Sequence, residues 1–66
     1  MTTPTKGTIW QSKIHPEARV EIRECRAGWV EYEVIAAPHE APEELGYFGG
    51  TAIEEFEEFF TPVDAR

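Results

Sequence analysis

The chain has 66 residues, one cysteine and a formal net charge of −7 at pH 7. This length allows one domain with a small core, and a single cysteine excludes an internal disulfide. Residues 1–35 carry five basic and five acidic side chains, whereas residues 36–66 carry eight acidic side chains and one arginine. The whole net charge therefore lies in the C-terminal half. Such a surface repels phosphate, so we do not expect direct binding of DNA or RNA.

The N-terminal residues 1–6 predict a flexible tail, and residues 7–66 predict a single small domain. The tail lacks the apolar run of a signal peptide, and no stretch approaches the roughly 20 apolar residues that span a bilayer. A lone Cys25 suits a reducing compartment. We therefore expect a cytoplasmic protein without a membrane segment. The first strand is expected over residues 7–13, before the break at residues 15–17.

Apolar and polar side chains alternate over residues 19–35, which predicts a β-hairpin with one buried face. Keeping the apolar residues together places Ile22 opposite Tyr32 and Val20 opposite Val34.

That register corresponds to a three-residue loop at residues 26–28, with Arg23 opposite Glu31. Gly28 would then adopt a positive φ, which glycine does without steric penalty. A two-residue loop would move the apolar side chains of one strand to the wrong face.

Residues 36–46 contain two prolines and three glutamates and predict an exposed loop. Residues 47–48 predict a short strand that ends at the glycines 49–50.

The clearest helix signal follows, because Thr51 and Glu54 have the spacing of a capping box. Ile53, Phe56 and Phe60 share one helical face, which would pack on the sheet.

Phe59 is predicted beside Phe56, and Pro62 is predicted to stop the helix. A last short strand is expected over residues 61–64. The expected fold is mainly β with one short C-terminal helix. A small SH3-like barrel, or a strongly bent antiparallel sheet capped by the helix, would hide the strand edges. An open sheet with the helix across one face is the alternative.

Several short motifs are spread over most of the chain. They are Gly7-x-Ile9-Trp10, Val20-x-Ile22, Trp29-Val30-x-Tyr32 and Phe56-x-x-Phe59-x-x-Pro62-Val63. This pattern resembles short uncharacterised proteins of actinobacterial phages and their hosts, which are similar to SH3-like modules in strand layout. The resemblance implies an SH3-like fold and, for a phage-encoded protein, action in the host cytoplasm. It implies no catalytic residues.

The soft metal ligands in the sequence are His15, His39 and Cys25, and their spacings match no zinc motif. We therefore expect no metal and no cofactor. A chain of this size has little volume for a catalytic cleft, so we expect a protein that is not an enzyme.

Two groups of side chains are candidates for partner binding. The first is an acidic face made by Glu43, Glu44, Glu54, Glu55, Glu57 and Glu58. Charge runs are also common as plain solvated faces. The second is an aromatic groove made by Trp10, Trp29 and Tyr47, whose alternative role is core packing.

These features favour a non-enzymatic acidic module that engages a basic surface on another protein. A phage-encoded modulator or DNA-mimic inhibitor of a host protein is the specific form of this hypothesis. One alternative is a small structural, self-associating or virion-assembly protein, which would be a homo-oligomer. The other is an SH3-like or Tudor-like reader of peptides or cationic residues.

Overall fold

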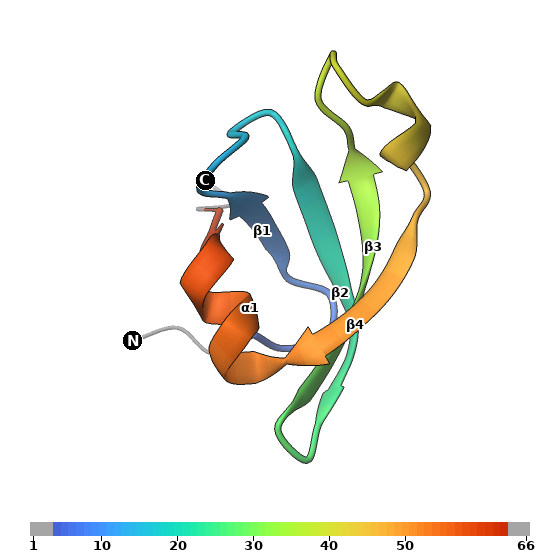
Figure 1. Ribbon diagram of the computed structural model, residues 1–66. Coiled ribbons are helices and arrows are strands. Elements are labelled where there is room, and N and C mark those ends of the chain that lie inside the picture. The colour runs from blue at the N-terminus through green and yellow to red at the C-terminus, as the bar shows by residue number, and fades with distance from the viewer. Residues whose placement is uncertain (1–3, 64–66) are drawn as a thin grey trace.

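The computed structural model describes residues 4–63 (Figure 1). Its elements are β1 (Ile9–Ser12), β2 (Arg19–Arg26), β3 (Trp29–Ala36), the 3₁₀-helix η1 (Pro42–Glu44), β4 (Phe48–Ala52), α1 (Ile53–Phe59) and β5 (Phe60–Pro62). The strands form one open antiparallel sheet in the order β4-β3-β2-β1-β5. The prediction of a mainly β fold with one short helix near the C-terminus is confirmed. Because α1 follows one edge strand and leads into the other, it crosses one face of the sheet, here called the inner face (Figure 1).

The register predicted for the central hairpin is confirmed where its apolar residues pair. Val20 lies opposite Val34 and Ile22 opposite Tyr32, and the two valines and Ile22 are buried. Alternation at period two therefore identified the inner face of β2 and β3 correctly.

The predicted loop of the hairpin is wrong. The loop has two residues, since Arg26 pairs with Trp29, and Ala27 and Gly28 both have positive φ, 54° and 74°. These angles are those of a type I′ turn, whose twist matches that of the flanking strands. Gly28 has the expected positive φ.

A β-bulge at Arg23 reconciles this short loop with the apolar register. It is Glu24, not Arg23, that lies opposite Glu31, and the extra residue turns Cys25 back toward the core beside Val30. Arg23 instead donates hydrogen bonds from Nε and Nη2 to Glu33 across the exposed face. These bonds and the negative charge of Glu33 raise the pKa of Arg23.

The predicted end of the fourth strand is also wrong. β4 runs through Gly49 and Gly50 instead of stopping at them. A Cβ on Gly49 would lie 2.7 Å from Tyr47 Cε2, and one on Gly50 would lie 2.8 Å from Trp29 Nε1. Aromatic rings from neighbouring positions thus occupy the space that side chains of β4 would fill, so both positions favour glycine.

The predicted capping box is absent, because Thr51 is the fourth residue of β4. Ala52 occupies the N-cap position without a side-chain hydrogen bond, and the Thr51 hydroxyl donates to Glu55 Oε1 at 3.1 Å. The backbone N–H of Ile53 donates to the carbonyl oxygen of Gly28 at 3.0 Å, so the hairpin turn holds the start of the helix.

The helix also ends earlier than predicted, at Phe59, and Phe60 already belongs to β5. β5 pairs with β1, which confirms a last short strand, while Asp64 of the predicted strand lies outside the described residues. Of the predicted stripe, Phe56 is fully buried, and Ile53 and Phe60 pack against the core. Phe59, predicted beside Phe56, is half exposed.

The core lies on the inner face under α1. Its buried members are Trp10, Val20, Ile22, Val30, Val34 and Phe56. Phe56 meets the edge of Trp10 at a centroid distance of 5.1 Å.

Within the predicted tail, Pro4 is buried, and residues 1–3 lie outside the part of the chain described here. No helix within residues 4–63 is long and apolar enough to cross a membrane.

Candidate functional site

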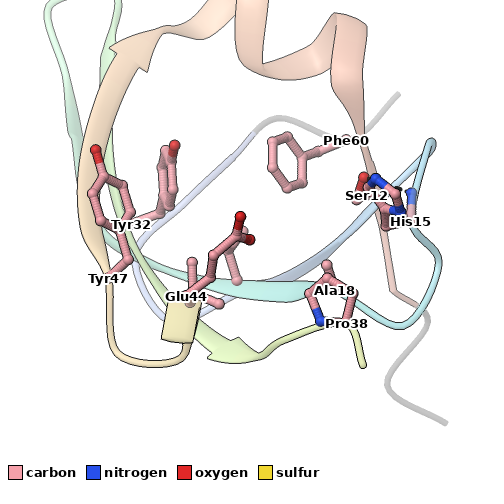
Figure 2. A pocket seen from close by; sticks show the side chains of 10 residues that line it. Ser12, His15, Ala18, Tyr32, Pro38, Glu44, Tyr47 and Phe60 are labelled. Carbon is pink, nitrogen blue, oxygen red and sulfur yellow. Dashed lines mark hydrogen bonds between the residues drawn. The ribbon is translucent and has the colours of Figure 1, made fainter. Parts of the chain in front are cut away.

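A pocket of about 360 Å³ opens on the inner face beside the helix (Figure 2). Its wall draws on four separate parts of the chain, namely β1 with the loop that follows it, the β2–β3 hairpin, the segment from Pro38 to Tyr47, and β5. The lining residues are Ser12, His15, Ala18, Val20, Tyr32, Val34, Pro38, Glu44, Tyr47 and Phe60.

Three aromatic rings shape the pocket. Figure 2 shows Tyr32 and Tyr47 on one side and Phe60 on the other. The Phe60 ring stacks on buried Phe56 at a centroid distance of 4.6 Å, and Tyr32 lies 6.0 Å from Phe60. The core therefore supports Phe60 and Tyr32 from behind, whereas Tyr47 is 59% exposed and leans over Gly49.

The polar groups of the pocket have an acidic bias. Glu44 is the one carboxylate among the lining residues, and its side chain points into the space between Tyr32 and Phe60 (Figure 2). Among residues 4–63, no lysine or arginine lines the pocket. Burial, followed by the charge of Tyr47, raises the pKa of Tyr32, so its hydroxyl stays protonated at neutral pH.

A turn at the end of β1 builds the opposite rim. The Ser12 Oγ accepts hydrogen bonds from the backbone N–H groups of Ile14 and His15 at 3.1 and 3.0 Å. Within the described residues no hydrogen bond joins the Ser12 hydroxyl to the His15 ring. Ser12 thus acts as a turn-capping residue, and the pair lacks the contact of a nucleophile with its base.

The predicted acidic residues fall into two groups. Glu54, Glu55, Glu57 and Glu58 are exposed on α1, and Glu43 and Glu44 are exposed on η1. The two helices flank opposite ends of β4 (Figure 1). Within residues 4–63, no ion pair involves any of these six glutamates. Their charge is therefore available to a partner, and among them Glu44 also lines the pocket.

The three predicted groove residues do not meet. Trp10 is buried in the core, 2% exposed, and its indole Nε1 donates to Thr8 Oγ1 at 3.1 Å. Trp29 is half exposed and lies on the outer face, across Gly50. Of the three, Tyr47 alone lines the pocket.

Sequence reasoning missed Tyr32 and Phe60 as site residues, because both carry the pattern of plain core residues. Their neighbours in the wall come from loops that are distant in sequence, and no spacing rule connects such positions. The sequence feature that indicated part of this site is the combination of aromatic residues and glutamates in residues 43–48, of which Glu44 and Tyr47 line the pocket.

The structure also brings together His15, Glu17 and Glu40, whose candidate ligand atoms lie within 4.8 Å of one another. All three are exposed. The loops that carry them meet at the end of the sheet nearest the pocket, where His15 also forms part of the rim.

Comparisons of the chain with protein-family models, curated proteins and solved structures find no match.

Proposed function

We propose that this protein is a non-enzymatic binding module that engages a basic surface of another protein, with its pocket receiving one cationic side chain. The observation that carries this proposal is the pocket lined by Tyr32, Tyr47 and Phe60, with the Glu44 carboxylate between the rings. The part of its wall that the structure describes contains no lysine or arginine. Aromatic faces attract cations by about 0.5–2 kcal/mol, depending on desolvation.

The remaining glutamates support the same proposal. The exposed carboxylates of α1 and η1 have no ion-pair partner within the described residues, so they add a long-range field that attracts a basic partner. A phage-encoded modulator or DNA-mimic inhibitor, acting on a host nucleic-acid enzyme or defence protein, is the specific form that the sequence resemblance suggests. The antiparallel pairing of β5 with β1 supports an SH3-like strand layout within an open sheet.

An NMR titration with small probes tests the pocket. The probes are N-acetyl-arginine amide, N-acetyl-lysine amide and the uncharged N-acetyl-norleucine amide. We expect the two cations to perturb Tyr32, Tyr47 and Phe60, and norleucine to bind at least several-fold more weakly. Glu44→Gln should reduce the difference between lysine and norleucine. The matched control is Glu43→Gln, which removes the same charge from the same η1 turn but outside the pocket wall.

Two results would contradict the pocket's role. One is equal binding of the norleucine and lysine probes, and the other is an equal loss of lysine-probe binding in Glu43→Gln and Glu44→Gln.

A separate variant tests the acidic helix. In this variant Glu54, Glu55, Glu57 and Glu58 are all replaced by glutamine. For a basic protein partner, this variant should lower mainly the association rate, and added salt should shrink its deficit.

The second candidate function is self-association as a small structural or virion-assembly protein. The observation that favours it is the pair of large apolar side chains on the outer face, Trp29 and Phe48, which are 49% and 56% exposed. Sedimentation over a range of concentrations tests this candidate. A dimer that Trp29→Ser dissociates would favour self-association over the binding module.

A further inference from the structure

The edge of β4 offers unpaired backbone groups. β4 is the last strand in the sheet order and pairs with β3 alone. Just before β4, the Val34 N–H donates to the Tyr47 carbonyl oxygen, and just after it, the Ile53 N–H donates to the Gly28 carbonyl oxygen. In an antiparallel ladder every second residue bonds to the same neighbour. Gly49 and Thr51 therefore bond to β3.

The intervening residues Phe48, Gly50 and Ala52 direct their N–H groups away from the sheet. Phe48 and Gly50 are both exposed, so this edge is accessible to another chain. None of the three N–H groups donates to a loop, turn or side chain within residues 4–63.

This edge also lacks the usual protection. Edge strands are commonly blunted by lysine, proline, a bulge or an inward-pointing charge. β4 has the sequence Phe-Gly-Gly-Thr-Ala, which contains no lysine, proline or charged residue. It pairs with β3 in a continuous register, without a bulge. The two glycines bring no side chains of their own, and the rings of Tyr47 and Trp29 occupy that space on the two faces of the strand.

Charge indicates what the edge accepts. Glu31 lies opposite Gly50 in the register, Glu44 precedes the strand, and Glu54 follows it. Glu33 lies opposite Phe48 and is already paired with Arg23. β4 itself carries no charged side chain. A second copy of this chain would bring a further charge of −7 and the same glutamates against this surface. An extended basic segment has the complementary charge.

We infer that β4 accepts an extended basic segment of a partner protein as a sixth strand of the sheet. The segment's backbone bonds to the outward groups of Phe48, Gly50 and Ala52, and its basic side chains meet the surrounding glutamates. Because Tyr47 precedes β4 directly and forms one wall of the pocket, a strand on this edge passes close to the pocket. This inference rests on the proposed function in one respect, namely that the partner is basic.

Proline substitutions test the edge by removing its outward N–H donors. Ala52 has φ −66° and ψ 147°, which proline adopts, and its N–H points away from the sheet. Ala52→Pro therefore removes one outward donor, and the matched control Ala52→Ser keeps it. Phe48→Pro removes a second donor, and its control Phe48→Ala loses the same ring but keeps the N–H.

The probe is a ten-residue peptide of alternating arginine and valine. We expect each proline variant to bind it roughly five- to tenfold more weakly than its own control, because each loses one strand hydrogen bond. In the parent, the Gly50 amide should exchange rapidly with solvent when free and slowly when bound. The Gly49 and Thr51 amides should be protected in both states.

Several outcomes would overturn the inference. They are equal binding by each proline variant and its control, an unprotected Gly50 amide in the complex, and no binding of the peptide at all. A concentration-dependent dimer that the proline variants dissociate would overturn it as well, in favour of a second copy.

If Glu44→Gln weakens binding of N-acetyl-lysine amide while each proline variant binds the peptide as well as its control, the edge inference fails and the proposed function stands. If the proline effects appear and Glu44→Gln has none, the pocket proposal fails and the strand site stands.

Discussion

The inner face of the sheet has two parts that differ in what covers them. In the helix-covered part, Trp10, Ile22 and Val30 lie under Phe56, and all four are at most 2% exposed. In the open part, Tyr47 stands over the pocket and is 59% exposed. The same kinds of apolar residue thus form a closed core at one place and the wall of an open pocket at another.

The length of α1 explains the difference. Its seven residues make about two turns, and one aromatic side chain, Phe56, is buried beneath it. The stacked ring of Phe60 marks the boundary, since it contacts the core on one side and lines the pocket on the other. A helix this short stabilises a small sheet while leaving part of its inner face uncovered.

The largest effect is expected from removing the helix's contribution to the core. Phe56→Ala should lower the free energy of unfolding by about 3–5 kcal/mol, because it empties a fully buried position. A domain of this size has little stability to spare, so the variant should be largely unfolded at 37 °C. Urea denaturation followed by tryptophan fluorescence measures this effect. Melting like that of the parent would mean that α1 does not close the core.

A smaller effect is expected at the turn that holds the start of the helix. Gly28→Val should cost about 1–2 kcal/mol, since a β-branched residue is strained at φ 74°. The control is Ala27→Gly, which relieves an alanine at φ 54° and should be neutral or stabilising. Thermal melts of both variants measure these changes. Equal melting of Gly28→Val and the parent would contradict the type I′ turn.

In the open part, loss of an equally large ring should change stability little. Tyr47→Ala is expected to lie within about 0.5 kcal/mol of the parent in free energy of unfolding, because the ring is mostly exposed. The same variant should weaken binding of N-acetyl-arginine amide several-fold by removing a wall of the pocket. A loss of stability close to that of Phe56→Ala would remove the distinction between the two parts.

The sequence predicted the helix-covered part better than the open part. Alternation identified the pairing of Ile22 with Tyr32, and helical spacing identified Phe56, because both signals depend on neighbours in the same element. The bulge at Arg23 left no such signal, and it compensates for a loop that is one residue shorter than the sequence predicted. The pocket could not be predicted either, because its wall combines residues of β1, β2, β3 and β5 with residues of the β1–β2 and β3–β4 connections.

Glycines 49 and 50 show a similar limit. Two adjacent glycines usually predict a break in a strand, and here the strand continues through them. Their role depends on the rings of Trp29 and Tyr47, which reach over them from positions that local sequence patterns do not connect. Burial of Trp10 and exposure of Trp29 likewise depend on which face each occupies, not on residue type.

The smallest effect concerns pH. Burial raises the pKa of Tyr32 above its ordinary value of 10.0, with a further contribution from the charge of Tyr47. A group whose pKa is higher in the folded state stabilises the fold fully below its unfolded pKa and loses that contribution as pH rises through the folded pKa. The parent should therefore lose stability from about pH 10 upward, and Tyr32→Phe should lose less over the same range. Urea midpoints between pH 8 and pH 11 measure the difference.

The control is Tyr47→Phe, which removes the charge of Tyr47 but not the burial of Tyr32, so part of the pH dependence of stability should remain. Parallel curves for the parent and Tyr32→Phe would mean that the Tyr32 ring at the pocket wall is as well hydrated in the folded chain as in the unfolded one.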